Sequence, residues 1–202
     1  GQLRVVGEIA DEYARGPGTN PVFGDAYADF TTRQSIQLHW IELSDVPAVF
    51  EKLEANGLST QQACGDSWRN IVGNPVAGKD GQEVIDAWPV IRDLNERFKG
   101  NDDHATLPRK WKVSVTGSAD GSGQGDINDL AFEPAYKSVD GDGDEDGSGG
   151  DASGDAVGFN VRVGGGLARN EPRFARDIDV WVPPERVPDV AGGLSALFRD
   201  HG

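Results

Sequence analysis

The segment Leu107–Thr116, LPRKWKVSVT, places the strongest constraint on what this chain can fold into. Its apolar residues alternate with polar ones, which is the period of a β-strand with one buried face. The apolar face holds Trp111, Val113 and Val115, and the polar face holds Lys110, Lys112, Ser114 and Thr116. Because charged side chains usually face water, these residues alone favour a half-exposed strand with solvated lysines over an anion site.

Periodicity elsewhere predicts helices and strands in one α+β fold. Thr32–Leu43 alternates as a strand, with Arg33 at the edge of its polar face. Pro89 is expected to break or kink the helix in which it lies. The expected helices are residues 3–14, 44–57, 82–99 and 187–198, and the expected strands are residues 32–43, 110–116, 127–132, 158–163 and 178–182.

The balance of charge restricts the possible partners. The 202 residues include 34 acidic and 19 basic side chains, so the net charge is −15. Nucleic acids and anionic membrane surfaces both require a positive footprint, and we therefore expect neither as a partner. An acidic composition that is poor in lysine also indicates a halophilic organism with a high-salt cytoplasm.

Other features of the composition concern location and completeness. No run of apolar residues is long enough to cross a bilayer or to act as a signal peptide, so a soluble, cytoplasmic protein is expected. Cys64 is the only cysteine and cannot form an internal disulfide. The sequence contains no methionine, even at its first position, which indicates a fragment of a longer reading frame.

A low-complexity acidic run, DGDGDEDGSGGDASGD, lies within residues 138–156. It offers almost nothing to bury, so an inserted, solvated surface loop is expected. A calcium loop is the alternative, because Asp142, Asp144 and Asp146 match the first acidic positions of that pattern. The match is incomplete, since Ser153 stands where the final glutamate is required.

Several longer motifs follow one another along the chain. They are TTRQSIQLHWIEL (Thr31–Leu43), CGDSWRNIVGNPVAGKD (Cys64–Asp80), LPRKWKVSVTG (Leu107–Gly117), GDINDLAFEPA (Gly125–Ala135) and GFNVRVGGGL (Gly158–Leu167). Together they resemble the N-terminal half of the siroheme-dependent nitrite and sulfite reductases. The resemblance implies that residues 1–60 form a ferredoxin-like half-domain without its first strand. It also implies that residues 61–202 form a siroheme-binding α+β domain with the acidic insert at 138–156.

The resemblance further implies an oxyanion site beside the siroheme. By matching motifs, its catalytic basic residues are Arg33, Arg69, Lys110 and Lys112, and its cofactor-binding residues are Arg109, Gln34, Asn70 and Asn74. These residue types suit the role, because siroheme carboxylates and substrate are both anions and arginine holds a planar oxyanion bidentately. Structural capping is the alternative role for the glutamine and the asparagines, and pairing with a structural acid is the alternative for Arg109. The histidines show no metal-ligand spacing, so no metal site is expected from them.

For activity, the family implies six-electron reduction of sulfite to sulfide or of nitrite to ammonia, with ferredoxin as the electron donor. The siroheme would be shared with the C-terminal half of the same enzyme. A [4Fe-4S] cluster needs four cysteine thiolates, and this sequence has only Cys64. The cluster is therefore expected only in the C-terminal half, outside this chain, and the chain alone is expected not to turn over substrate.

The choice of substrate rests on one residue against two motifs. RNIVGNPVAGKD and INDLAFEPA are closer to nitrite reductases, whereas a second lysine, Lys112, is typical of sulfite reductases. An extra positive charge suits the dianion sulfite better than the monoanion nitrite, and we therefore expect sulfite. The alternatives are a ferredoxin-dependent assimilatory nitrite reductase and a non-catalytic half-module that binds a tetrapyrrole.

Overall fold

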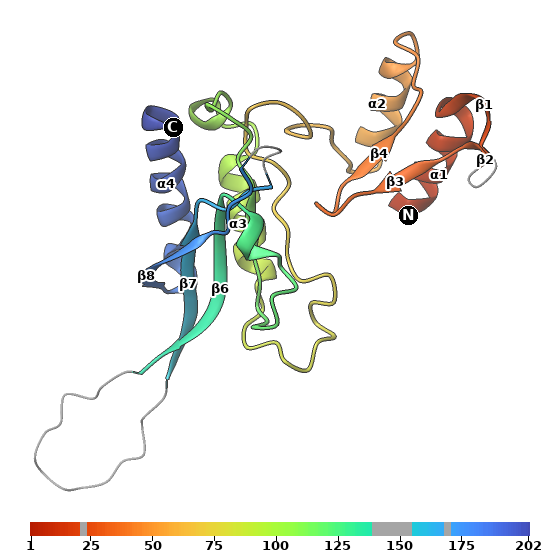
Figure 1. Cartoon of the computed structure of the whole chain (residues 1–202). Coiled ribbons are helices and arrows are strands. Elements are labelled where there is room, and N and C mark those ends of the chain that lie inside the picture. Colours follow the sequence, from red (N-terminus) through yellow and green to blue (C-terminus); the bar gives the residue numbers. More distant parts are fainter. Residues whose placement is uncertain (21–23, 139–154, 168–170) are drawn as a thin grey trace, which may run out of the picture. The chain divides into compact units, whose positions relative to one another are not determined.

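The structure, a computed structural model, describes residues 1–20, 24–138, 155–167 and 171–202. These residues form two compact units, Gly1–Ala63 and Cys64–Gly202 (Figure 1). Helices and β-sheets occur in both units, which confirms the expected α+β fold class.

The N-terminal unit packs two helices and two β-hairpins around a small core. Its elements are α1 (Gln2–Tyr13), β1 (Arg15–Asn20), β2 (Gly24–Ala26), β3 (Ala28–Phe30), β4 (Ile36–Leu38) and α2 (Val46–Glu54). Each hairpin is an antiparallel two-stranded sheet, β1 with β2 and β3 with β4. Ile9 from α1 packs against Val49 and Leu53 from α2 at the centre of the core. Helical periodicity predicted α1 correctly, whereas the β1–β2 hairpin is not among the expected elements.

Arg33 lies in the turn of the β3–β4 hairpin, which corrects the expectation that it stands on a strand. β4 spans only Ile36–Leu38, and Gln34 before it has a positive φ of 55°. The N–H of Gln34 donates to the carbonyl oxygen of Thr31 at 2.9 Å, and the N–H of Thr31 donates to that of Ser35 at 2.9 Å. A tight turn closed by a left-handed residue is common in short hairpin loops. The turn therefore holds Arg33 at the tip of the hairpin.

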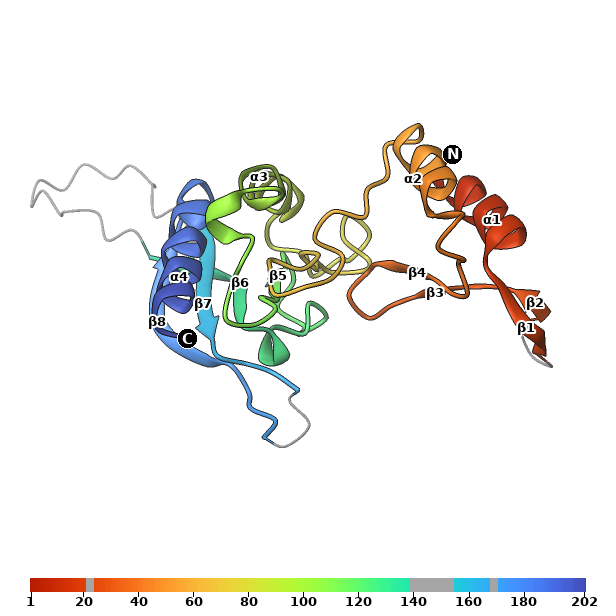
Figure 2. The same cartoon turned by 90° about the horizontal axis from the view of Figure 1, so that it is seen from above.

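The C-terminal unit is built on a four-stranded sheet of order β5-β6-β7-β8 (Figure 2). Its helices and strands are α3 (Trp88–Phe98), β5 (Val113–Val115), β6 (Leu130–Lys137), β7 (Ala156–Val163), β8 (Arg176–Val182) and α4 (Val187–His201). Short 3-10 helices connect them at η1 (Asp102–His104), η2 (Gly125–Ile127) and η3 (Pro184–Arg186). β5 pairs in parallel with β6, and the other neighbouring strands are antiparallel.

The larger core lies between this sheet and the two α-helices that cover one of its faces (Figure 2). Val113, Phe132 and Phe159 supply the core from three neighbouring strands and are 0% exposed. Leu94 from α3 and Val187 from α4 close it from the helix side and are also fully buried. The strands contribute alternate residues, because neighbouring side chains point to opposite faces of a sheet.

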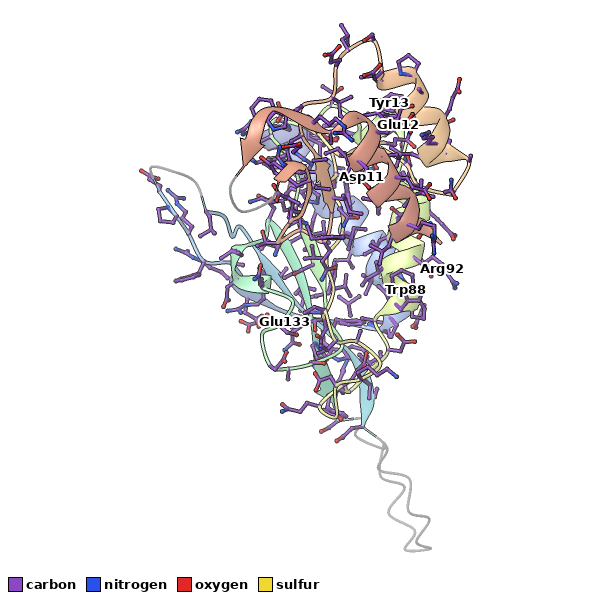
Figure 3. All side chains as sticks on the ribbon, turned by 90° about the vertical axis from the view of Figure 1, so that its right-hand side faces the viewer. Asp11, Glu12, Tyr13, Trp88, Arg92 and Glu133 are labelled. Carbon is purple, nitrogen blue, oxygen red and sulfur yellow. The ribbon has the colours of Figure 1, made fainter. Side chains whose placement is uncertain are left out.

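The helix α3 buries one face and exposes the other. Val90, Leu94 and Phe98 recur at the spacing of one helical turn and are all buried. Trp88 and Arg92 project from the helix elsewhere (Figure 3), and Trp88 is 63% exposed. The amphipathic pattern of the sequence therefore predicted which residues of α3 enter the core.

The starting points of two elements differ from their expected positions. The helix expected at 82–99 begins only at Trp88, because Pro89 occupies its first turn. A proline is well tolerated there, since the first N–H groups of a helix have no partner within it, and it starts the helix instead of kinking it. The strand expected at 127–132 begins at Leu130, because the residues up to Ile127 form η2.

The strand β5 is shorter than expected, and both its faces are buried. Its apolar alternation is confirmed in the core, but Ser114 and Thr116, expected on an exposed face, are only 1% and 2% exposed. The segment before η2 covers this face, where a Cβ on Gly123 would lie 2.9 Å from that of Thr116. The polar face is therefore open only at its lysine end, where Lys110 is exposed and Lys112 half-buried.

The outer strand β8 is bulged at its centre. The pairing register between β7 and β8 shifts between Asn160 and Arg162. Asp179 lies in the bulged part of β8 and has a positive φ of 55°. The bulge interrupts the row of backbone N–H and C=O groups along this edge of the sheet.

Other expectations concern the insert and the membrane. The calcium-loop pattern and nearly all of the acidic insert fall on residues 139–154, outside the described residues. The strands that flank the insert run antiparallel, with Lys137 opposite Ala156. In the described ranges, no helix combines the length and the apolar character needed to span a membrane.

Candidate anion-binding site

Residues 68–72 run alongside the start of β5 and bring together the predicted cations of the C-terminal unit. Trp68 forms a parallel β-bridge with Trp111, and the N–H of Arg69 donates to the carbonyl oxygen of Trp111 at 2.8 Å. A second parallel bridge, from Val72, continues the pairing. The segment therefore acts as a short additional strand on the edge of β5 that faces away from β6.

The two tryptophans of this pairing turn the cations away from the core. Trp68 and Trp111 are 2% and 5% exposed and pack in the larger core. In extended backbone the next residue points the opposite way, so Arg69 leaves the core beside Lys110 and Lys112. Arg69 and Lys112 are half-buried, which reduces the solvent screening of their charges and strengthens their attraction for an anion.

The loop at Gly65 and Asp66 contacts two of the predicted arginines. Arg109 Nη1 lies 3.4 Å from Asp66 Oδ1, and the side chains are 70% and 48% exposed. An ion pair this exposed contributes little to stability. Arg69 Nη1 donates to the carbonyl oxygen of Gly65 at 3.5 Å. An incoming anion would therefore compete with one exposed carboxylate and one carbonyl oxygen for these guanidinium groups.

Asp66 and Asp129 are residues of this region that sequence analysis did not predict. The carboxylate of Asp129 accepts the backbone N–H of Lys112 at 2.8 Å and fixes the backbone that presents this lysine. Both acids lie inside recognised motifs, CGDS and INDL. Their partners are distant in the sequence, so no local pattern indicated the contacts.

The two asparagines predicted at the cofactor differ in their surroundings. Asn70 is exposed, whereas Asn74 is 7% exposed. The Nδ2 of Asn74 donates to Ser118 Oγ at 2.8 Å and to Asp80 Oδ2 at 3.0 Å. Hydrogen bonding, foremost from the Ser118 hydroxyl, holds the pKa of the Asp80 carboxyl below its ordinary value. Asn74 therefore ties its loop to the end of β5, and its contact with a cofactor stays a prediction.

Arg33 and Gln34 belong to the N-terminal unit. Arg33 is half-buried and Gln34 exposed in the hairpin turn described above. On the same hairpin, His39 Nε2 lies 2.6 Å from Asp29 Oδ2, so this histidine is engaged within the unit. The participation of Arg33 and Gln34 in one site with the cations of the C-terminal unit stays a prediction.

An iron-sulfur cluster does not fit the residues of this chain by themselves. The described residues contain no group of three or more His, Cys, Asp or Glu side chains that could hold a metal ion. Cys64, the single cysteine of the sequence, is exposed. A [4Fe-4S] cluster requires four thiolates.

The C-terminal unit is an α+β domain in which helices cover a sheet and arginine and lysine side chains gather at one edge. Domains of this class are suited to binding an anion. Comparison with known proteins identifies the family. The family model of the nitrite and sulphite reductase 4Fe-4S domain matches residues 64–202, and that of the nitrite/sulfite reductase ferredoxin-like half domain matches residues 22–56. The chain belongs to the nitrite and sulfite reductase family, which confirms the resemblance found in its motifs.

Individual relatives include reductases of both oxyanions. The assimilatory ferredoxin-dependent nitrite reductase of Haloferax mediterranei is 46% identical to this chain. The match covers 100% of this chain and 33% of the relative's length. Sulfite reductase (ferredoxin) 1 of Mycolicibacterium paratuberculosis is 39% identical over 99% of this chain and 31% of its own length. The solved structure of the Mycobacterium tuberculosis NirA protein matches with a TM-score of 0.81 and 35% identity, over 100% of this chain and 32% of that one.

The chain spans about a third of the length of the curated relatives it matches. The family model named for a 4Fe-4S domain lies on residues 64–202 of this chain. The [4Fe-4S] cluster was expected only in the C-terminal half of the enzyme, outside this chain. That expectation is wrong in part, because the matched domain model lies within the chain. One cysteine cannot supply four thiolates, so residues of this chain can provide at most part of the cluster's surroundings.

Proposed function

We propose that this chain is part of an oxyanion reductase that acts on sulfite or nitrite. The observation that carries the proposal is the parallel pairing of residues 68–72 with the start of β5, which gathers Arg69, Lys110 and Lys112 at one edge of the sheet. An anionic substrate and an anionic cofactor both require nearby cations that neutralise their charge. Membership of the nitrite and sulfite reductase family supports the same function.

Arg69, Lys110 and Lys112 form what we call the cationic edge. The cationic edge fits a siroheme, whose carboxylates carry negative charge. When bound, the siroheme iron would ligate the oxyanion and supply it with electrons. Arg109, which is 70% exposed, would exchange its weak pairing with Asp66 for a siroheme carboxylate. Asn70, exposed next to Arg69, would hydrogen-bond at the edge of the macrocycle.

The basic side chains would divide two tasks between them. Arg69 would hold the negative charge of the oxyanion, because guanidinium stays protonated and binds planar oxyanions bidentately. Lys110 and Lys112 would donate the protons that turn each departing oxygen into water, since an ammonium group gives up a proton far more readily than a guanidinium group does. Arg33 would add a further positive charge from the N-terminal unit.

Finer features of the proposal follow from the relatives and the composition. Residues 1–60 would form the ferredoxin-like half-domain and residues 61–202 the siroheme-binding domain. Ferredoxin would be the electron donor, as the names of the relatives support. A salt-adapted protein is supported by the net charge of −15 and by the relative from Haloferax mediterranei, and we propose that it is cytoplasmic.

Sulfite and nitrite are each favoured by one observation. Lys112 adds a positive charge that favours the dianion sulfite. The identity of 46% to a nitrite reductase, against 39% to a sulfite reductase, favours nitrite. We place sulfite first, because a side chain that faces the substrate acts on discrimination directly, whereas overall identity does not.

The complete protein that contains this chain provides the test. The visible spectrum of added siroheme should change when the protein binds it. The protein should also reduce sulfite or nitrite with a chemically reduced viologen as donor. Replacing Lys110 and Lys112 together by glutamine should weaken oxyanion binding at least about tenfold, because two charge-assisted hydrogen bonds are lost. Lys99→Gln is the matched control, because Lys99 is an exposed lysine at the end of α3.

Each outcome separates the candidate functions. An unchanged siroheme spectrum would exclude a role in binding this cofactor. Binding of siroheme without reduction of either oxyanion would favour the tetrapyrrole-binding module instead of a reductase. Equal losses in the double lysine variant and in Lys99→Gln would remove the cationic edge as the reason for oxyanion binding.

A further inference from the structure

A buried serine forms a hydrogen bond with the residue that precedes Arg69. Ser195, in α4, is 0% exposed. Its Oγ lies 2.8 Å from Nε1 of Trp68 and 3.0 Å from Nδ1 of His104. A hydroxyl on the apolar face of a helix is unfavourable unless it is hydrogen-bonded, and these two contacts satisfy it. None of the three side chains belongs to the cationic edge.

The direction of one hydrogen bond in this trio follows from its chemistry. An indole Nε1–H can only donate, so the Ser195 oxygen accepts from Trp68. The oxygen of Ser195 has a second lone pair as well as its own proton, so it can either accept from or donate to Nδ1 of His104, according to the tautomer of the ring. One chain of hydrogen bonds joins α4, η1 and the segment before Arg69.

The same face of α4 also holds the second tryptophan of the pairing. Trp111 stacks on Phe198 with ring centroids 4.9 Å apart and an interplanar angle of 30°. Ser195 and Phe198 are three residues apart and lie on one helix face. α4 therefore contacts Trp68 and Trp111 together, and in each case the next residue along the chain is a cation of the candidate site.

We propose that Ser195 is a positioning residue for the candidate anion site. Its hydroxyl fixes the indole of Trp68, and the indole fixes the backbone that presents Arg69 beside Lys112. The inference rests on the proposed function of that site. The link is short, because Arg69 follows Trp68 directly and its N–H is bonded to Trp111. Small displacements of a side chain that holds a reacting anion are costly, so a loosened indole should weaken oxyanion binding.

His104 makes this positioning sensitive to pH. Its ring meets Phe98 edge-on, with centroids 4.9 Å apart and an angle of 88°. Burial, foremost, lowers the pKa of His104; the charges of Arg199 and Arg97 act in the same direction, and Asp103 opposes them. Protonation would place a positive charge within this buried trio of side chains and make both ring nitrogens of His104 donors. We therefore expect the packing around the indole to be undisturbed while His104 is neutral and to loosen in acid.

Oxyanion affinity in the complete protein, read from the visible spectrum of its siroheme, is the first measurement. Ser195→Ala should weaken nitrite binding about tenfold, as is typical when a partner behind a ligand-binding residue is removed. Trp68→Phe keeps an aromatic ring but removes the indole donor, and it should produce the same loss. Ser59→Ala removes an exposed hydroxyl in the N-terminal unit and should leave the affinity unchanged.

The pH dependence supplies the second measurement. Nitrite is the probe, because it stays a monoanion between about pH 5 and 8, the range in which histidine titrates. Its affinity for the unaltered protein should fall as the pH drops below about 6.5, and His104→Asn should flatten this dependence. The indole N–H resonance of Trp68 in the 202-residue chain should shift in Ser195→Ala and exchange faster with solvent.

The outcomes distinguish this inference from the function on which it rests. Equal nitrite affinity in Ser195→Ala, Trp68→Phe and the unaltered protein would overturn the positioning role and leave the proposed function standing. The positioning role would also be overturned if the two variants lost thermal stability but bound nitrite normally. If the unaltered protein bound neither nitrite nor sulfite, the proposed function would fall, and the positioning role with it.

Discussion

The two units of this chain differ in how well each can stabilise itself. The C-terminal unit buries a core shared by four strands and two helices, whereas the core of the N-terminal unit centres on Ile9, Val49 and Leu53. The sheets of the N-terminal unit are two-stranded hairpins, which are marginally stable without further support. It also exposes Phe30 at 69% and Leu43 at 88%. Because buried apolar area is the main source of stability, we expect the C-terminal unit to be the more stable of the two, although both contain helices and strands.

The largest expected effect lies in the core of the C-terminal unit. Phe132→Ala should lower the free energy of unfolding by about 3–5 kcal/mol, because it leaves a cavity beside Phe159 in a core with little room to collapse. Phe174→Ala is the control, since Phe174 is 74% exposed and its loss should cost about 0.5 kcal/mol or less. Urea unfolding monitored by circular dichroism measures both. Similar losses would mean that this core is not what stabilises the unit.

A core substitution in the N-terminal unit should act on that unit alone. Ile9→Ala should remove about 2–4 kcal/mol, which is enough to open a unit with so small a core. Amide hydrogen exchange should become fast in α1 and α2 while β6 and β7 stay protected. Leu3→Ala, on the exposed side of α1 at 69%, is the matched control. Simultaneous loss of protection in both units would contradict their independence.

A moderate effect should separate the contributions of the two units to the proposed site. In the complete protein, Lys112→Asn should shift the ratio of kcat/KM for nitrite over sulfite upward by about tenfold, because the dianion loses more attraction than the monoanion. Arg33→Gln, in the N-terminal hairpin, also removes one positive charge and should shift the ratio in the same direction if Arg33 contributes to the site. Steady-state kinetics with both substrates measures the ratio. An unchanged ratio in Lys112→Asn would remove the reason for placing sulfite first.

A smaller effect should distinguish the units by their response to pH. The pKa of His104 is lowered in the folded chain, mainly by burial, so the unfolded chain takes up its proton first as the pH falls. The stability of the C-terminal unit should therefore be complete above about pH 6.5 and decline towards lower pH. His104→Asn should abolish this decline. Urea midpoints measured across the pH range would follow this decline, with amide hydrogen exchange at β6 and α1 as separate probes of the two units. A decline of equal size in both units would contradict its assignment to His104.

Sequence patterns predicted the features that depend on local spacing. The apolar periodicity of residues 3–14 and 187–198 located α1 and α4, and the alternation at 158–163 located β7. The lysines of LPRKWK were placed on the side away from the core because Trp111 between them is apolar. Such features follow from one helix or one strand at a time, which is why a single sequence contains enough information for them.

Features that depend on distant partners were not predictable in this way. Arg33 was expected on a strand, but the left-handed backbone at Gln34 turns the chain there, and alternation alone does not report that. Thr116 was expected to face water, but the segment before η2 covers it. Ser195 resembles any small residue of a helix until Trp68 and His104 are found beside it. Each depends on a contact between segments far apart in the sequence.

The bulge at Asp179 determines how the sheet of the C-terminal unit can be extended. A sheet recruits another polypeptide by offering an unbroken row of backbone donors and acceptors, and β8 does not offer one. The bulge exposes Asp179 together with Ile178 and Val180, of which the two apolar side chains are 38% and 40% exposed. We therefore expect a neighbour at this edge to contact side chains more than backbone groups. The same irregularity should protect the chain from strand-by-strand aggregation when it is concentrated.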